Sequence, residues 1–175
     1  MLNIIKNHFE SGRQVKKYAE IEPIVEEMQA LIDKGIKKGN YDKGFALSHC
    51  QVSRNPYAFF VVGSAWVGKE KKDGWPAAAI INPQILEVTD KIDVGTKENP
   101  DMRQNVFTYD EACFSFPFRQ PKKVKRYYRI TVQYQVKGLF GLKTVVEEIE
   151  GLRAHIFQHE MMHCLGENIY WAKKK

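Results

Sequence analysis

Near its C-terminal end the sequence reads Gln-His-Glu-Met-Met-His, residues 158–163. His159 and His163 are four residues apart, so a helix would place both imidazoles on one face, one turn from each other. Two imidazoles so spaced can bind one divalent metal ion, and Glu160 would lie beside that ion, able to accept a proton from bound water. The pattern therefore predicts a helix at this point and a third ligand from elsewhere in the chain.

The position of that third ligand is constrained by how little sequence follows His163. Ile169 occupies the place where one class of zinc protease has its third histidine. Another class uses a glutamate about twenty residues further on, beyond the last residue here. We therefore expect the third ligand upstream. The candidates left open by this reasoning are the carboxylates together with His8, His49, His155, Cys50 and Cys113.

Composition favours a single intracellular domain. The 175 residues, 43% of them hydrophobic, suit one domain over 1–175, with an N-terminal segment at 1–20 and a short tail at 167–175. The cysteine count of 3 is odd, which favours reduced thiols over disulfides. The sequence has no apolar run near the roughly 20 residues that cross a bilayer, and no secretory signal. We predict a cytoplasmic protein without membrane association.

The net charge is +6, and basic residues form two clusters. The first is Lys69, Lys71 and Lys72, and the second is Lys122, Lys123, Lys125, Arg126 and Arg129. Both can be solvated surface, or they can attract a polyanion such as ribosomal RNA without reading its bases. We predict no specific binding to DNA.

Residue patterns predict a helix within 21–35, where Pro23 suits the first turn and Gly35 the end. Strands are predicted at 58–67 and at 77–86, the latter interrupted at Asn82 and Pro83. The polar residues 91–110 predict an exposed loop.

Apolar and polar residues alternate well over 126–150, which predicts a hairpin that turns at 138–141. Apolar positions that include Ala154, Ile156, Phe157 and Met161 predict a helix over 152–165. The predicted fold class is α+β, with antiparallel strands packed around a central C-terminal helix that carries His-Glu-x-x-His, and with an N-terminal helix.

Three segments together resemble the signatures of the peptide deformylase family. They are Gly-Phe-Ala-Leu-Ser-His-Cys-Gln at 44–51, Glu-Ala-Cys-Phe-Ser at 111–115 and Gln-His-Glu-Met-Met-His at 158–163. They occur in the family's order, and the resemblance extends over roughly 21–166. It implies a peptide deformylase-like fold and removal of the formyl group from the N-terminal formylmethionine of nascent polypeptides, with release of formate.

The resemblance also implies a metal site. Cys113, His159 and His163 would hold one divalent ion, typically Fe²⁺ with Zn²⁺ or Ni²⁺ able to replace it, and a metal-bound water would be the nucleophile. Glu160 would be the general base that deprotonates this water.

Further roles follow from the same resemblance. The Gln51 side-chain amide and the Phe114 backbone N–H would donate hydrogen bonds to the oxyanion. Gly44 would let the chain approach the substrate closely. Apolar residues would line the pocket that holds the side chain of formylmethionine. For substrate binding we name Gly44, Phe45, Ala46 and Ile156, and the basic surface would permit contact with the ribosome.

Three of the departures from the family pattern bear most directly on the site. Ala46 and Ala112 replace glycines, and the added methyl groups would narrow the groove or restrict the backbone. Met162 replaces an aspartate that pairs with an arginine at the position of Arg126. A buried unpaired arginine is costly, so we predict that Arg126 is exposed or pairs elsewhere.

Two alternatives belong to other classes. One is a small metalloprotease that uses His-Glu-x-x-His, for which Cys113 would be dispensable. The other is a non-catalytic relative that binds formylated N-termini or the ribosome. The presence of all three candidate ligands together with Glu160 and Gln51 argues against the non-catalytic alternative, because a binding protein gains nothing from a general base beside an open metal site.

Overall fold

The computed structural model of the protein describes residues 4, 10–35, 45–68, 70–71, 73–93 and 101–170. His8, Gly44, Lys69 and Lys72 lie outside the described residues. The elements along the chain are η1 (Tyr18–Glu20), α1 (Glu22–Lys34), β1 (Ala46–Ser48), η2 (His49–Gln51), β2 (Phe59–Val62), η3 (Ser64–Trp66), β3 (Ala79–Val88), β4 (Lys91–Asp93), β5 (Met102–Gln104), β6 (Val106–Glu111), β7 (Lys122–Tyr127), β8 (Arg129–Gly138), β9 (Gly141–Glu150) and α2 (Gly151–Cys164), where η denotes a short 3-10 helix.

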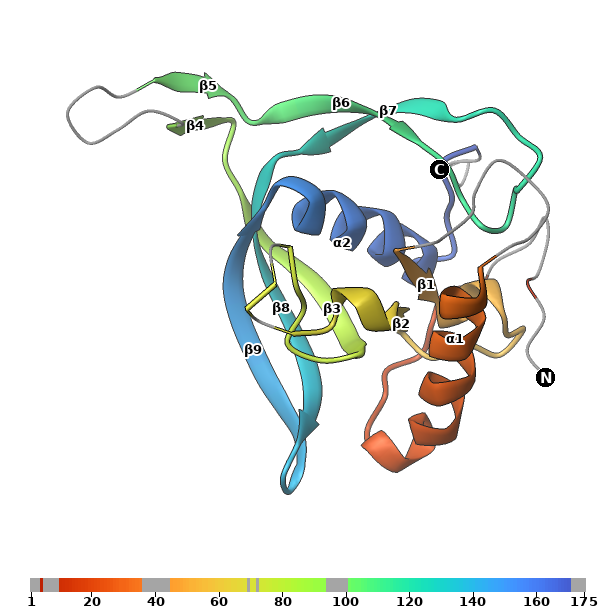
Figure 1. The fold of residues 1–175 in the computed structure, drawn as a ribbon. Helices are drawn as coiled ribbons and strands as arrows, with labels where there is room; N and C mark the ends of the chain where they lie inside the picture. Colours follow the sequence, from red (N-terminus) through yellow and green to blue (C-terminus); the bar gives the residue numbers. More distant parts are fainter. Residues whose placement is uncertain are drawn as a thin grey trace.

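Antiparallel strands form one main sheet and two smaller ribbons. The main sheet has the strand order β1-β2-β3-β8-β9, and the pairs β4–β5 and β6–β7 form the ribbons. Figure 1 shows α2 between the curved main sheet and the β6–β7 ribbon. This arrangement confirms the predicted α+β fold, with antiparallel strands around a C-terminal helix.

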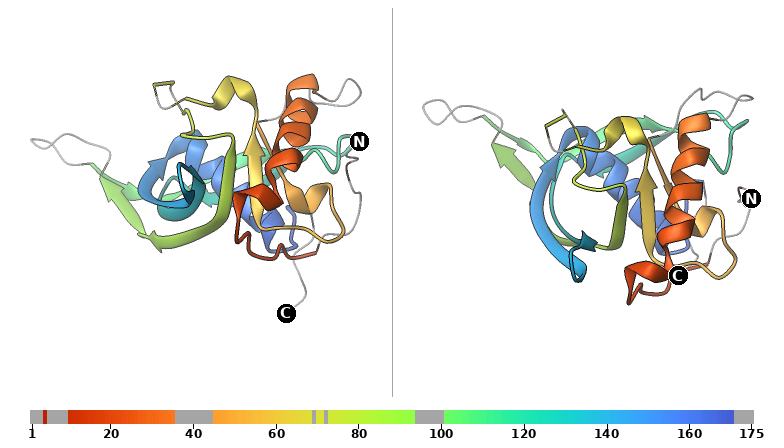
Figure 2. Two further views of the ribbon diagram at one scale, coloured as in Figure 1. Left: turned by 90° about the horizontal axis from the view of Figure 1, so that it is seen from below. Right: turned by 60° about the horizontal axis from the view of Figure 1, so that its bottom comes forward.

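Strand β2 separates two parts of the core. Its residues alternate between the two faces of the sheet, as the pleat requires. Phe60 packs against Phe157 of α2, while Phe59 belongs to the cluster that contains Val25 and Met28 of α1. Both faces of β2 are therefore buried, and α1 and α2 lie on opposite sides of it (Figure 2).

Helix α2 begins where the chain leaves β9. Gly151 has φ +60, a left-handed conformation that glycine adopts with little cost, and its N–H donates to the carbonyl of Tyr128 at 2.8 Å. The helix then runs through the interior, with buried residues on more than one side, including Ala154, Phe157 and His163. A helix so enclosed can hold polar side chains away from bulk water.

Both predicted helices and the predicted hairpin are confirmed. The helix expected within 21–35 is α1, and the helix expected at 152–165 is α2. The hairpin consists of β8 and β9, and the turn between them lies at 138–141. Within the described residues, no helix has both the length and the apolar character needed to span a bilayer.

The predictions for 58–67 and 77–86 were partly wrong. The first strand ends at Val62, and η3 follows it. The second continues through Asn82 and Pro83 as β3, with a register shift there. Asn82 has φ +50, and its side chain bonds both the N–H and the carbonyl of Val15. This irregularity accommodates proline within a strand.

The prediction of a loop at 91–110 was also wrong where the structure describes this range, since β4, β5 and most of β6 lie there. Residues 94–100 lie outside the described residues. These strands pair only within two-stranded ribbons, and all three residues of β5 are exposed. A strand without a buried face does not need alternating apolar residues, so its sequence resembles that of a loop.

Candidate metal centre

Three possible metal-binding side chains meet at the C-terminal half of α2. One ligand atom each from Cys113, His159 and His163 lies within 4.8 Å of the others, and all three residues are buried. The Nε2 atoms of His159 and His163 are 3.2 Å apart, and Cys113 Sγ lies 3.3 Å from Nε2 of His163. The helix supplies the two histidines one turn apart, and the segment after β6 supplies the cysteine.

The outer nitrogen of each imidazole faces an acceptor. Nδ1 of His159 lies 2.8 Å from Oε2 of Glu111, and Nδ1 of His163 lies 2.8 Å from the carbonyl oxygen of Glu167. An Nδ1–H that donates to these acceptors puts the Nε2 lone pair of each imidazole on the side of the cluster. Such outer partners orient imidazoles for metal binding.

Burial lowers the pKa of both His159 and His163, so their neutral forms are favoured. The same effect raises the pKa of the Cys113 thiol to about 12. Three neutral groups whose ligand atoms converge can bind a cation between them. A bound ion would favour the thiolate, because metal coordination deprotonates a thiol. The set of one sulfur and two nitrogens suits a transition metal or zinc.

Glu111 connects the centre to two further side chains, Arg126 and His155. Arg126 donates to both of its carboxylate oxygens, at 2.7 and 2.8 Å, and His155 Nε2 lies 2.7 Å from Oε1. Burial acts to raise the pKa of Glu111, but hydrogen bonds from His155, His159 and Arg126 outweigh it and hold the pKa well below its ordinary value. The prediction that Arg126 is exposed or pairs elsewhere is confirmed, because it pairs with Glu111 in place of the missing aspartate.

Glu160 has an unusual environment for a carboxylate. It is buried, and its Oε2 has no hydrogen-bond partner among the described residues. Burial raises its pKa to about 8. An unpartnered buried carboxylate oxygen costs folding free energy, which a protein retains where a ligand or water completes the site. This oxygen is a second indication that the centre is built to hold another group.

The side chain of Gln51 also contacts Cys113. Its Oε1 accepts the Ser48 N–H at 2.9 Å, and its Nε2 lies 3.1 Å from Ser115 Oγ and 3.4 Å from Cys113 Sγ. The carbonyl end of the side chain is therefore anchored to β1, which directs the amide donors toward the cysteine.

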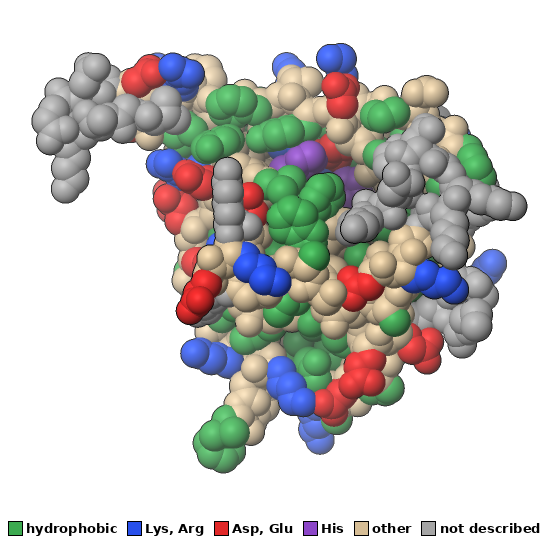
Figure 3. Space-filling model, viewed as in Figure 1, with side chains coloured by type: hydrophobic (Ala, Val, Ile, Leu, Met, Phe, Trp, Pro, Cys, Tyr) green, Lys and Arg blue, Asp and Glu red, His purple; other side chains and the backbone are tan. Residues whose placement is uncertain are grey.

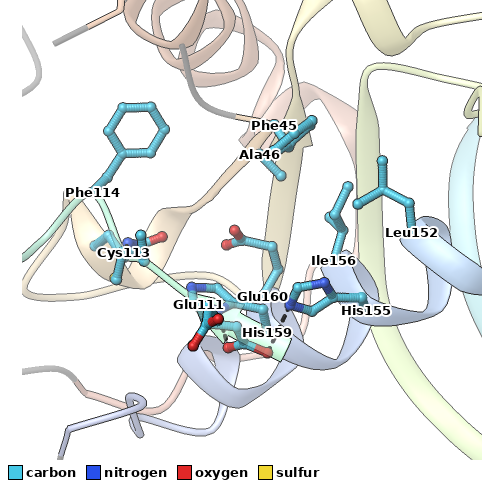
Figure 4. Close-up of a pocket in the computed structure, with 13 residues that line it drawn as sticks. Phe45, Ala46, Glu111, Cys113, Phe114, Leu152, His155, Ile156, His159 and Glu160 are labelled. Atoms are coloured by element: carbon cyan, nitrogen blue, oxygen red, sulfur yellow. Dashed lines mark hydrogen bonds and ion pairs between the residues drawn. The ribbon is translucent and has the colours of Figure 1, made fainter. Parts of the chain in front are cut away.

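A cavity of about 260 Å³ opens beside these groups. The lining includes Phe45, Ala46, Gln51, Cys113, Phe114, Ile156, His159 and Glu160, and also Glu111, Leu152 and His155. Figure 4 shows Glu160 pointing into this space from α2. In Figure 3 histidine side chains are visible in a hollow bordered by apolar side chains. The cavity joins a polar floor to an apolar flank.

The other candidates for a third ligand that lie among the described residues do not join the cluster. His49 accepts the Tyr57 N–H at its Nδ1, and Cys50 contacts Cys164. His155 is held by Glu111. His8, like the predicted substrate-binding Gly44, lies outside the described residues.

Leu152 is a pocket residue that the sequence reasoning missed, and His155 was considered there only as a ligand. Leu152, His155, Ile156 and His159 follow the spacing of one helical face. Because His159 was already a candidate ligand, this spacing was an available signal for the residues that share its face.

The family model described as polypeptide deformylase matches residues 3–173. The chain belongs to this family. A peptide deformylase of Caulobacter vibrioides is 29% identical over 146 residues, which cover 83% of this chain and 71% of that protein. A peptide deformylase of Thermotoga neapolitana is 36% identical over 89 residues, which cover 50% of this chain and only 43% of that protein.

Solved structures agree with this peptide deformylase assignment. The crystal structure of peptide deformylase from Thermotoga maritima has a TM-score of 0.66 and 28% identity, over 97% of this chain and 95% of that chain. A mutant form of peptide deformylase 1B of Arabidopsis thaliana has a TM-score of 0.70 and 20% identity, over 97% of this chain and 79% of that one. The latter likeness concerns the fold alone.

Peptide deformylases are metal-dependent enzymes that remove the formyl group from nascent peptides. The family match and the names of the relatives support this activity and favour neither the metalloprotease nor the non-catalytic alternative. The Cys113, His159 and His163 cluster can bind the metal ion that the family requires.

Proposed function

We propose that this chain hydrolyses the formyl amide of N-formylmethionyl peptides, releasing formate and a free amino group. The observation that carries the proposal is the meeting, in one buried cavity, of three converging donor atoms and an unpartnered carboxylate oxygen. Cys113, His159 and His163 would hold one divalent ion, with Fe²⁺ in the cell and Zn²⁺ or Ni²⁺ as replacements. Such an ion lowers the pKa of a bound water and polarises a carbonyl.

Glu160 is assigned the transfer of protons. Its elevated pKa, about 8, lies near neutrality, so its carboxylate can accept a proton from water and return it to the departing amine nitrogen. Its Oε2 has no competing partner among the described residues and is free to do so.

Charge that develops on the formyl oxygen needs donors. We assign this role to the Nε2–H of Gln51 and to the backbone N–H of Phe114. The anchoring of Gln51 Oε1 by the Ser48 N–H supports the assignment, because it leaves the Nε2 hydrogens directed at the site. Phe45, Ala46 and Ile156 line the apolar flank, which we assign to the methionine side chain together with Gly44.

The test combines metal analysis with a formate assay. Protein prepared without oxygen and loaded with Fe²⁺ or Ni²⁺ should release formate from a formyl-Met-Ala-Ser peptide. Glu160→Gln should bind the same amount of metal, because Glu160 is not a ligand, but turnover should fall at least about 100-fold. Unchanged turnover in this variant would contradict the mechanism, and a protein that holds metal but releases no formate would contradict the function.

We infer a cytoplasmic location from the same substrate, because nascent chains that carry formylmethionine are made there. We infer that the basic strand β7 attracts ribosomal RNA. Lys122 donates to the carbonyl of Ile169 and Lys123 approaches Asp110, whereas Lys125 is exposed on the same ribbon. Co-sedimentation with ribosomes should weaken as salt rises and should weaken further in Lys125→Glu. Retention that is independent of both would contradict this part.

A further inference from the structure

His155 lies in the cavity beside the candidate metal centre without belonging to the ligand set. It precedes His159 by one turn of α2, and its side chain lines the cavity next to Leu152 and Ile156. A histidine here interrupts an apolar flank, and two other side chains hold its ring.

Two partners fix the His155 ring. Its Nε2 lies 2.7 Å from Oε1 of Glu111, a hydrogen-bonding distance. Tyr109 of β6 stacks on the ring with centroids 4.2 Å apart and an interplanar angle of 25°. In Figure 4 the second ring nitrogen lies on the side away from Glu111. These contacts hold the imidazole in one orientation, with one face of the ring covered by Tyr109.

Glu111 has partners besides His155. Arg126 binds both carboxylate oxygens of Glu111, and Nδ1 of His159 lies 2.8 Å from its Oε2. The contact with His155 also fixes the histidine ring, which lines the cavity, so we look for a function of the ring there.

The cavity offers rings as well as aliphatic groups. Phe45 is 45% exposed and is tilted against Trp66 with centroids 4.9 Å apart. Figure 4 shows Ile156 between Phe45 and His155. A thioether gains from contact with aromatic rings, often at their edges, whereas a methylene group of the same size does not.

We propose that His155 is a specificity-determining residue that makes the cavity prefer a sulfur-containing side chain over an aliphatic side chain of equal length. This proposal rests on the proposed function, since the side chain concerned is that of the formylated residue. Methionine and norleucine differ only in sulfur against methylene, so the pair isolates the effect.

The experiment compares kcat/KM for formyl-Met-Ala-Ser and formyl-norleucyl-Ala-Ser with the Ni²⁺-loaded protein. The unmodified protein should favour the methionine peptide about two- to tenfold, the range expected for sulfur–aromatic contacts. Each protein is measured on both peptides, so the fraction of folded, metal-loaded enzyme cancels in the ratio.

Two variants separate the ring from the contact with Glu111. His155→Gln keeps a donor for Glu111 but removes the ring, and its ratio should fall to less than half that of the unmodified protein. His155→Phe keeps a ring but removes the donor, and its ratio should stay within about twofold of the unmodified one.

An unchanged ratio in His155→Gln would overturn the proposal, as would an equal loss in both variants or the absence of any preference in the unmodified protein. None of these results touches the proposed function, because formate is released in each. Absence of formate from both peptides with unmodified protein would instead overturn the proposed function itself.

Discussion

Glu111 illustrates how one buried charge organises several side chains. It is almost fully enclosed, yet it accepts hydrogen bonds from Arg126 and holds the imidazoles of His155 and His159. Its carboxylate thus neutralises a guanidinium and orients a candidate ligand. A buried charge whose partner is removed is strongly destabilising, because the remaining charge has left water without compensation.

The substitution Glu111→Gln should therefore have two effects. The free energy of unfolding of the metal-free protein should fall by about 3 kcal/mol, because Arg126 is left without its carboxylate. Affinity for Ni²⁺ should fall about tenfold or more, because the oriented Nδ1–H of His159 loses its charged acceptor. Urea unfolding and metal titration measure the two effects.

Asp110 provides the matched control for this prediction. It is an exposed neighbour in the sequence, and its carboxylate lies 3.9 Å from Lys123. Asp110→Asn should change stability by no more than about 0.5 kcal/mol. Equal effects of the two substitutions would show that Glu111 has no special part in the cluster.

At the scale of elements, α2 and β2 position the centre. Helix α2 carries His159, Glu160 and His163, and Phe157 on the same helix packs edge-on against Phe60 of β2 with centroids 5.8 Å apart. The β8–β9 hairpin, by contrast, projects beyond the core at its turn, where Phe140 is 97% exposed.

These two phenylalanines, Phe60 and Phe140, form a matched pair of substitutions. Phe60→Ala should lower the free energy of unfolding by about 3–5 kcal/mol, because it leaves a cavity between β2 and α2. Phe140→Ala should change it by no more than about 0.5 kcal/mol, because its side chain is already in water. Chemical denaturation of both variants measures the difference, and similar losses would contradict the packing described.

At the scale of the whole molecule, the candidate ligands come from two distant parts of the sequence. Cys113 follows β6 of a two-stranded ribbon, whereas His159 and His163 belong to the helix packed on the main sheet. An ion bound by all three would connect the ribbon to the helix. It would therefore stabilise the folded state as a whole, because the unfolded chain does not hold the three donors together.

Removal of metal should accordingly lower stability. Ni²⁺ or Zn²⁺ at about 100 times its Kd should raise the free energy of unfolding by about 2.7 kcal/mol, and a chelator should reverse the gain. Mg²⁺ is the control, because it prefers oxygen ligands and should give no increase. Thermal unfolding with each ion measures the effect, which Cys113→Ala should abolish. An equal gain in that variant would contradict the assignment of the cysteine.

The sequence alone accounted for local structure that depends on residue spacing. The periods of 3.6 and 2 are properties of the backbone, so they predicted α1, α2 and the β8–β9 hairpin, and they placed His159, Glu160 and His163 on one helix. Strands β4, β5 and β6 were not predicted, because they are short and mostly exposed and so carry little alternation of apolar and polar residues.

Tertiary structure decided which distant side chains meet. The sequence left several candidates for a third ligand, and resemblance singled out Cys113, which the fold brings to the two histidines. No local pattern could show that Arg126 pairs with Glu111, or that Tyr109 stacks on His155, because such contacts depend on how β6, β7 and α2 pack. Backbone periodicity acts over a few residues, whereas a binding cavity is formed by elements far apart in the chain.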